Sequence, residues 1–344
     1  MNITTTQDSF TEITAYTEKI RQDMHASGSA LLIMKDNRIV HESYAGAHHF
    51  QEGAKSINAA SQFNVYSVRV TYIGLAAAIA VHNGDLNLDD KISFYLDDLD
   101  DEVLGESTLR HLLTQCTGLK IKNNAAKRLF EAGTNIEGKQ PDIVARIIHK
   151  VTGRTVHGIL TESVFKPLNM TQTEWVTNSK RNLVCDIHSP ESFPSLRLGS
   201  NEGDERNLYV SARELACWGN LHLHKGFIEG KQILPREVFD LAVKVQSPDT
   251  MPDHLPKHGF FWWVKHDEVS YEFDELGSNL PEGSYQILGA SGCSCTVIPD
   301  LNVVAVRMYN SLYTDELEKF DYIRDIKIFG DLVVSGIKHE TTQV

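Results

Sequence analysis

Apolar and polar positions recur with different periods along the chain, and at its start these periods predict a helix followed by strands. Residues 9–26 carry apolar side chains at helical spacing, namely Phe10, Ile13, Tyr16 and Ile20. The next two runs, SALLIMK (29–35) and RIVHESYAG (38–46), are extended, and Asp36-Asn37 between them favours a hairpin turn. The sequence therefore predicts an N-terminal helix and then a two-stranded hairpin.

The middle of the chain is predicted to be mainly helical. Residues 72–82 are apolar on every side, as expected of a helix inside a core, and Asn83-Gly84 favours its end. The following stretch to residue 107 is acidic and loop-like, and it lacks the regular ligand spacing of a calcium loop. Further helices are predicted over residues 108–114, 141–152, 158–166 and 211–225.

Beyond residue 255 the pattern returns to strands and then to a helix. The predicted strands are HGFFWWVKH (258–266), SYQILGAS (284–291), CSCTVIPD (293–300) and NVVAVRMYNS (302–311), and residues 314–337 return to helix. Strands from both chain ends must then share one sheet. We therefore predict an α/β (α+β) fold, in which an antiparallel sheet is flanked by N- and C-terminal helices and a mostly helical subdomain lies in the middle.

Length and composition are those of a folded soluble protein. The chain has 344 residues, of which 41% are hydrophobic and 23% are charged. We predict one domain over 1–344, with a sheet lobe from residues 1–60 and 250–344 and a mainly helical lobe from 61–249. The net charge of −13 and the absence of a Lys/Arg block argue against nucleic acid and anionic membrane as partners.

The sequence also predicts a cytoplasmic location and leaves the oligomeric state undefined. The N-terminal stretch has neither the basic start nor the apolar core of a secretory signal. The longest nearly unbroken apolar run, YIGLAAAIAV at 72–81, has about half the length that a membrane-spanning helix needs. Five cysteines form an odd and scattered set, which is typical of reduced thiols rather than a disulfide framework.

Five sequence motifs follow one another in an order that identifies a known superfamily. They are FNVYSV (63–68), STLRHLLTQCTGL (107–119), LFEAGTN (129–135), VTGRTVHGILTESVFKPLNMTQTEW (151–175) and HGFFWWV (258–264). Together they resemble the serine β-lactamase and penicillin-binding-protein superfamily, and in particular its class C β-lactamase-related esterases and peptidases. The resemblance implies a β-lactamase/transpeptidase-like fold. It also implies acyl transfer by the serine of S-x-x-K, with its lysine as base, a Y-x-N tyrosine that moves protons, and a K-T-G or H-x-G strand at the oxyanion hole.

The resemblance places Ser67 at the nucleophile position, but the catalytic lysine is missing. Three residues after Ser67 stands Val70, on the helix face from which the lysine would reach the hydroxyl. Serine is a weak nucleophile until a base takes its proton, and valine cannot accept one. Arg69 does not replace the lysine, because arginine stays protonated in proteins.

The other two motifs have also lost the groups that carry protons. Counting forward from the glycine turn puts the tyrosine and asparagine slots at Gly138 and Gln140, whereas counting back from 151–153 puts the tyrosine slot at Ile136. Lys139 is the nearest titratable side chain and becomes a base only if burial lowers its pKa. Ala290, Ser291 and Gly292 occupy the K-T-G or H-x-G slot, so its cation is absent.

Two functional hypotheses follow from these substitutions. The first is a catalytically degenerate member of the superfamily that binds a small acylated or peptide-like ligand, with candidate binding residues Tyr66, Lys139, Gln140, Ala290, Ser291 and Gly292. The second is an active serine esterase, amidase or biosynthetic acyltransferase in which Ser67 is activated by a replacement base, taken from Lys139, His111, His149 and His157. Neither a phosphate loop, a dinucleotide fingerprint nor an H-E-x-x-H pattern is present, so we predict no cofactor and no metal site.

Overall fold

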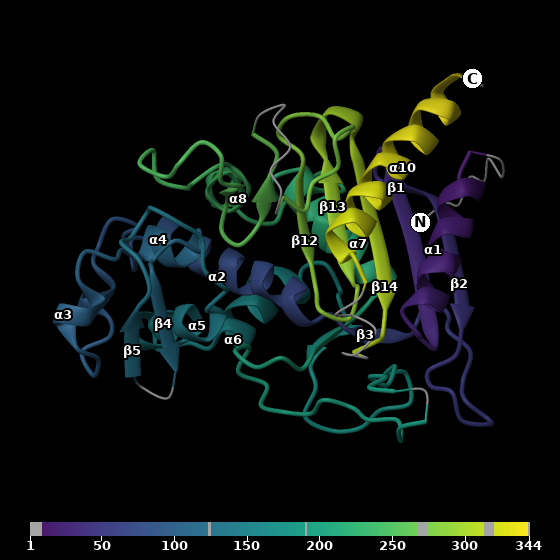
Figure 1. Cartoon of the computed structure of the whole chain (residues 1–344), viewed down its shortest axis with the longest axis horizontal. Helices are drawn as coiled ribbons and strands as arrows, with labels where there is room; N and C mark the ends of the chain where they lie inside the picture. The colour runs from purple at the N-terminus through teal and green to yellow at the C-terminus, as the bar shows by residue number, and fades with distance from the viewer. Residues whose placement is uncertain (1–8, 123–124, 190, 267–273, 313–319, 343–344) are drawn as a thin grey trace.

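Strands from both ends of the chain form one antiparallel sheet, as the sequence pattern predicted. The computed structural model describes residues 9–122, 125–189, 191–266, 274–312 and 320–342. Within these residues the sheet has the strand order β10-β11-β12-β13-β14-β1-β2 (Figure 1). Its strands are β1 (Gly28–Lys35), β2 (Arg38–Gly46), β10 (Lys257–His258), β11 (Trp263–Val264), β12 (Tyr285–Leu288), β13 (Ser294–Ile298) and β14 (Val303–Tyr309).

The hairpin of β1 and β2 forms at the predicted position. Asp36 and Asn37 have φ angles of 51° and 63°. A two-residue hairpin turn of type I′ needs positive φ at both central residues, and Asn and Asp adopt such angles at low cost. On its other side β1 pairs with β14, from Ser29 opposite Tyr309 to Lys35 opposite Val303. Strands from near the two ends of the chain are therefore hydrogen-bonded neighbours within the sheet.

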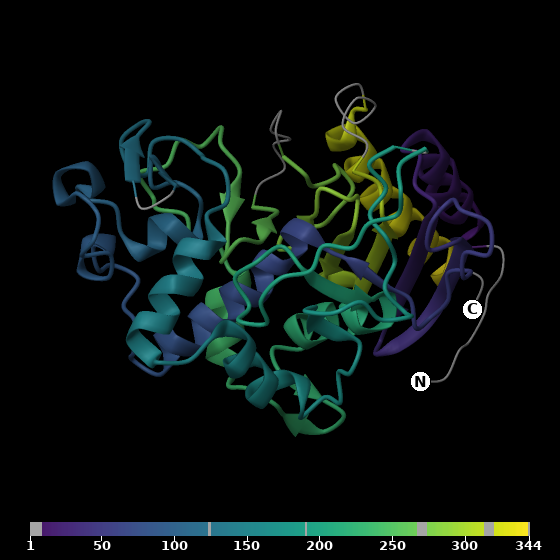
Figure 2. The same cartoon turned by 90° about the horizontal axis from the view of Figure 1, so that it is seen from below.

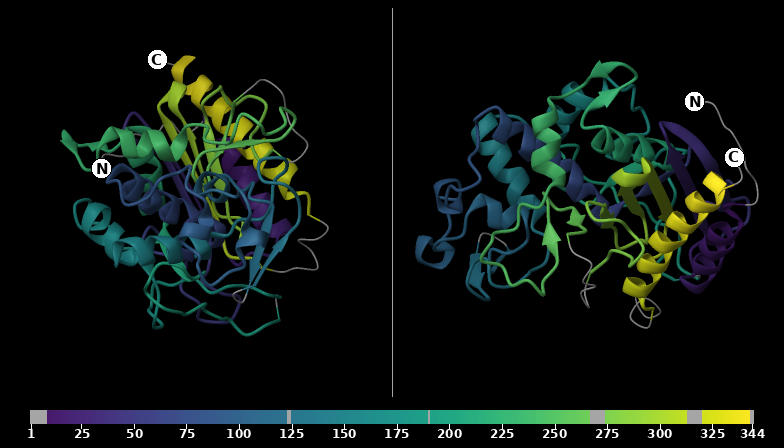
Figure 3. Two further views of the ribbon diagram at one scale, coloured as in Figure 1. Left: turned by 90° about the vertical axis from the view of Figure 1, so that its left-hand side faces the viewer. Right: turned by 90° about the horizontal axis from the view of Figure 1, so that it is seen from above.

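Helices cover both faces of this sheet. Helices α1 (Thr11–Asp23) and α10 (Tyr322–Thr342) pack on one face, and α7 (Ala212–Leu223) packs on the other (Figures 1 and 3). Alternate residues of β1 serve the two layers: Leu31 and Ile33 join the cluster under α1 and α10, while Leu32 joins the main core on the α7 side. This two-sided burial explains why β1 carries a continuous apolar run, Ala30 to Met34, instead of an alternation of apolar and polar residues.

The middle of the chain builds a mainly helical region around α2 (Val70–His82). Every residue of α2 from Val70 to Ala80 is buried. No helix of the described residues is long and apolar enough to cross a membrane. The remaining helices are α3 (Asp101–Leu104), α4 (Leu109–Leu113), α5 (Pro141–Thr152), α6 (Val156–Leu160), α8 (Arg236–Val243), the π-helical turn η3 (Thr161–Phe165), and the 3₁₀ turns η1 (Tyr66–Arg69), η2 (Ile92–Phe94) and η4 (Pro299–Leu301).

Short strands accompany these helices and were not predicted from the sequence pattern. One small sheet and two hairpins consist of β3 (Gln62–Asn64), β6 (Thr173–Trp175), β7 (Leu208–Ser211), β4 (Leu119–Lys122), β5 (Ala125–Arg128), β8 (Phe227–Ile228) and β9 (Lys231–Gln232). Runs of two to four residues are too short to show a period of two. Helix α8 was also missed.

The prediction of one continuous strand over residues 258–266 is wrong. The backbone reverses between β10 and β11, where the Gly259 N–H donates to the Trp262 carbonyl at 2.9 Å. Phe261 adopts a positive φ of 65° in this turn, a conformation that a bulky aromatic residue rarely takes. At the other end of the chain, the predicted helix over 314–337 begins at Tyr322, and residues 313–319 lie outside the described part.

The five cysteines are free thiols, as their number and spacing predicted. Cys116, Cys293 and Cys295 are buried. Burial raises the pKa of the Cys293 thiol to about 11, which keeps it neutral and unreactive. These thiols therefore act as small apolar side chains of the core.

Candidate functional site

A cavity of about 330 Å³ lies where the predicted nucleophile meets the sheet. We call it the Ser67 cavity. Its walls come from η1, the loop before α5, the end of β12 with its following turn, β14, and the start of α10. It is lined by Met24, Ser67, Lys139, Glu275, Leu288, Gly289, Ala290, Gly292, Arg307, Tyr322 and Asp325. The structure thus brings together four of the predicted site residues: Ser67, Lys139, Ala290 and Gly292.

The position of Ser67 is set by close contact between its backbone and the end of β12. Gly289 lies against the residues before Ser67, so that an added Cβ would be 2.3 Å from the Val65 carbonyl oxygen and 3.4 Å from the Ser67 nitrogen. Only a residue without a side chain permits this approach. The backbone of residues 65–67, which we call the nucleophile turn, therefore packs directly against the backbone at the end of β12.

Gly289→Ala is expected to destabilise the protein by about 1–3 kcal/mol, because the new methyl group must push the Val65 carbonyl away. The measurement is the free energy of unfolding in urea. Gly138→Ala is the matched control, since its Cβ would meet no atom within 4 Å. Equal effects of the two substitutions would show that the contact at Gly289 does not constrain the turn.

The residue three positions after Ser67 is an apolar side chain of the core. Val70 is 1% exposed and belongs to the main apolar core. Ser67 itself is half-buried at the cavity wall, and among the described residues its hydroxyl has no hydrogen-bond partner. No described side chain is therefore hydrogen-bonded to the hydroxyl in the way that a base activating a serine would be.

Tyr66 fixes the nucleophile turn instead of lining the cavity, which corrects its predicted role in ligand binding. Its φ of 45° is unusual for an aromatic residue. Its backbone N–H donates to Asn64 Oδ1 at 3.2 Å, and its hydroxyl donates to Asp186 Oδ2 at 2.5 Å. The Arg197 guanidinium lies 5.7 Å from the centre of its ring. These contacts hold the strained residue in place directly before Ser67.

Asp186 comes from the long segment between β6 and β7, which runs along the lower side of the molecule in Figure 1 and is seen from below in Figure 2. The carboxyl group is 3% exposed. Burial raises its pKa to about 6, and the hydrogen bond from Tyr66 opposes that rise. This segment therefore supports the nucleophile turn from outside the cavity.

Gln140 does not line the cavity, because its amide is bonded to the backbone of β4. Its Nε2 donates to the Leu119 carbonyl and its Oε1 accepts from the Ile121 N–H, both at 2.8 Å. The amide thus acts like an added strand beside β4. This corrects the prediction that the Gln140 amide contacts a ligand.

Ala290, Ser291 and Gly292 form the turn after β12, not part of a strand as the motif alignment predicted. The Gly292 N–H donates to the Gly289 carbonyl at 2.9 Å, and Gly292 has a φ of 87°. Ala290 and Gly292 line the cavity. The fully buried Ser291 donates instead to the Asn64 carbonyl at 3.0 Å, so it ties the turn to β3 and is not available to a ligand.

None of the three histidines considered as a replacement base lines the Ser67 cavity. His111 accepts from the Thr108 N–H at 3.0 Å and caps α4. His149 lines a different cavity beside α5. The His157 ring packs edge-to-face against Trp175, with ring centroids 5.8 Å apart. Of the predicted bases, only Lys139 shares a cavity with the serine.

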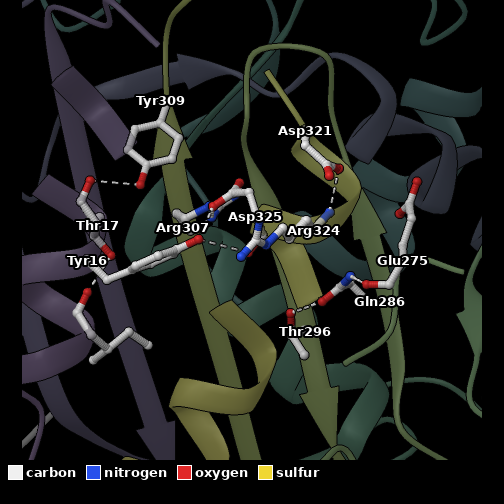
Figure 4. A network of polar contacts seen from close by, with 11 residues as sticks. Tyr16, Thr17, Glu275, Gln286, Thr296, Arg307, Tyr309, Asp321, Arg324 and Asp325 are labelled. Atoms are coloured by element: carbon white, nitrogen blue, oxygen red, sulfur yellow. Dashed lines mark hydrogen bonds and ion pairs between the residues drawn. The ribbon is translucent and has the colours of Figure 1, made fainter. Parts of the chain in front are cut away.

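Sequence reasoning missed three charged residues that line the same cavity as Ser67, namely Glu275, Arg307 and Asp325, which Figure 4 shows. Arg307 on β14 and Asp325 on α10 form a bidentate ion pair with N···O distances of 3.0 and 2.7 Å, and Tyr16 donates to Asp325 at 2.9 Å. Glu275 precedes β12 and is 6% exposed. A lone arginine inside the apolar run NVVAVRMYNS was a signal for the ion pair. Glu275 lies in no motif, so no feature of the sequence pointed to it.

Comparison with known proteins agrees with this geometry. The β-lactamase family model matches residues 16–328. The chain belongs to the β-lactamase family. An uncharacterized protein of Alkalihalophilus pseudofirmus is 38% identical to this family member over 328 residues, which cover 95% of this chain and 96% of the relative. A putative D-alanyl-D-alanine carboxypeptidase of Escherichia coli is 24% identical over 260 residues, which cover 63% of this chain and 58% of that protein.

Solved structures show the same β-lactamase fold. EstCE1, described as a hydrolase with promiscuous acyltransferase activity, superposes with a TM-score of 0.72 at 18% identity, over 94% of this chain and 98% of its own. A penicillin-binding protein homolog from Caulobacter crescentus gives a TM-score of 0.69 at 15% identity, over 95% and 98% of the two chains. The predicted fold class and superfamily are confirmed. This β-lactamase family member thus has the fold of the β-lactamase and penicillin-binding-protein-like serine hydrolases.

Proposed function

We propose that this β-lactamase family protein binds a small acylated or peptide-like ligand in the Ser67 cavity and does not perform base-activated acyl transfer. The observation that carries the proposal is the environment of Ser67. Its hydroxyl lacks a hydrogen-bond partner among the described residues, and the lysine slot is filled by the buried Val70. A positioned general base typically contributes 10²–10⁴-fold to such a reaction.

The surroundings of the serine support binding without efficient chemistry. No tyrosine stands at either counted slot of the second motif, and Ala290 replaces the cation of the third. The cavity itself is retained, and its volume lies at the lower end of the range of about 300–1,000 Å³ for small-molecule sites. A pocket that persists after its proton-carrying groups are lost is suited to holding a ligand.

One observation favours the second hypothesis, an active hydrolase or acyltransferase. Lys139 and Glu275 line the same cavity as Ser67, and either side chain is chemically able to take a proton from a serine. The neighbouring fold of EstCE1, a hydrolase, is compatible with such an activity. Under this hypothesis the base comes from the opposite wall of the cavity and not from the serine's own helix.

Intact-mass measurement after incubation with a fluorophosphonate and a panel of acyl esters tests the proposal. We expect no adduct on the wild-type protein, since an unactivated serine reacts too slowly. An adduct on the wild type that disappears in Ser67→Ala would instead establish the active hydrolase. Lys139→Gln then tests whether the lysine is the base, with Lys127→Gln on the exposed side of β5 as the matched control.

A further inference from the structure

We infer that the Ser67 cavity selects a zwitterionic ligand, such as a free dipeptide, whose ammonium group is bound by Glu275 and whose carboxylate is bound by Lys139. The inference rests on the proposed ligand-binding function and names the chemistry of the ligand. It is drawn from the charges on the cavity wall and from the partners that these charges have.

Four charged side chains line the cavity, and two of them already neutralise each other. Arg307 and Asp325 are 1% and 4% exposed and form the bidentate ion pair described above. Among the described residues, Lys139 and Glu275 form no hydrogen bond or ion pair through their side chains, either with each other or with other groups. One basic and one acidic side chain at the cavity therefore have no hydrogen-bond partner among the described residues and are available to a bound molecule.

Glu275 is the stronger part of this argument, because its carboxyl group is buried without a hydrogen-bond partner among the described residues. Its Oε2 atom is inaccessible to solvent and accepts no hydrogen bond. A buried carboxylate without a donor is costly, so such groups are normally paired. Burial raises the pKa of Glu275 to about 7, and the nearby charge of Lys139 opposes that rise. A ligand ammonium would supply the missing donors.

The backbone of Glu275 is hydrogen-bonded to the sheet, which fixes the point from which its side chain extends. Its carbonyl accepts from Gln286 Nε2 at 2.7 Å, and Gln286 Oε1 accepts from Thr296 at 2.6 Å (Figure 4). These bonds connect Glu275 to β12 and β13, the rigid part of the sheet. A group that is already ordered loses little conformational entropy when a ligand binds, and this favours ligand binding at Glu275.

Lys139 lines the same cavity as Glu275, and its ammonium group makes a simple cation an unfavourable ligand. A ligand with only a positive charge would be repelled by this ammonium, and a ligand with only a negative charge would be repelled by Glu275. A zwitterion satisfies both groups at once. Amino acids and short peptides with free ends are the common small molecules with this charge pattern.

Isothermal titration with alanyl-alanine, its N-acetyl derivative and its C-terminal amide tests the inference, using both chiralities of each compound. We expect the free dipeptide to bind the wild type about 10- to 100-fold more tightly than either blocked form, as for loss of a charge-assisted hydrogen bond. Glu275→Gln should remove the preference over the N-acetyl form. Lys139→Gln should remove the preference over the amide.

The outcomes separate this inference from the proposed function. Equal binding of free and N-acetylated dipeptide by wild type and Glu275→Gln would overturn the role of Glu275 while leaving ligand binding intact. Failure of every compound to bind would overturn this inference, whereas the proposed function is tested separately by the fluorophosphonate and acyl-ester measurement. Turnover of the dipeptide through a Ser67 adduct would overturn the non-catalytic function but retain the zwitterionic selectivity. Glu282→Gln, an exposed change of the same charge, is the control, and thermal unfolding verifies that each variant is folded.

Discussion

Val70→Lys is expected to increase the rate at which a fluorophosphonate labels Ser67 by about 10²–10⁴-fold, the usual contribution of a positioned general base. Val70 lies three residues after Ser67, and its N–H donates to the Ser67 carbonyl, so the two residues share one helical turn. The site is 1% exposed. Burial lowers the pKa of a lysine and so favours the neutral amine that accepts a proton. The labelling rate is followed by intact mass over time.

Two control variants test whether the faster labelling of Val70→Lys comes from the new base and occurs at Ser67. Val70→Met adds length without a base and should leave Ser67 inert, while Ser67→Ala combined with Val70→Lys should remove any new adduct. Because a buried lysine is destabilising, labelling is compared only at temperatures where thermal unfolding shows each variant to be native. A folded but inert Val70→Lys protein would show that more than the base has been lost from the cavity.

The sequence predicted the sheet and the main helices well because their signals are local. The hairpin at Asp36-Asn37 and the buried helix at α2 follow from turn chemistry and from uniform apolarity over more than two turns. The turn inside HGFFWWVKH could not be seen, since its positive φ falls on Phe261 and not on a glycine or asparagine. A pattern of consecutive aromatic residues gives no indication of such a reversal.

The candidate site was predicted only in part because proximity in space is not encoded in spacing along the chain. Ser67 and Lys139 were found from motifs and do share the cavity. Gln140 and Ser291 have side chains suited to ligands, but backbone groups of β4 and β3 take their hydrogen bonds first. Glu275 reaches the cavity through tertiary packing alone. Local chemistry identifies what a residue is able to bind, and the fold decides what it does bind.

The buried ion pair beside the cavity gives the largest expected effect on stability. Asp325→Ala should destabilise the protein by about 3–5 kcal/mol, because it leaves the Arg307 charge uncompensated at a site that is 1% exposed. The rings of Tyr309 and Phe329 lie 5.1 and 4.9 Å from the guanidinium and cannot replace a carboxylate. The free energy of unfolding in urea measures this loss. Asp23→Ala, which breaks an exposed pair with Lys19, is the control and should cost about 0–1 kcal/mol.

The double substitution Arg307→Met with Asp325→Leu separates charge from packing. Exchange of a buried ion pair for apolar side chains of similar volume is often neutral, so this variant should recover most of the stability that Asp325→Ala loses. Recovery would show that Asp325→Ala destabilises the protein because it leaves the buried Arg307 charge without a partner. A double variant as unstable as Asp325→Ala would instead mean that the pair, with the Tyr16 bond, is needed to dock α10 on the sheet. Since α10 also contributes Tyr322 to the Ser67 cavity, dipeptide binding should then be lost along with stability.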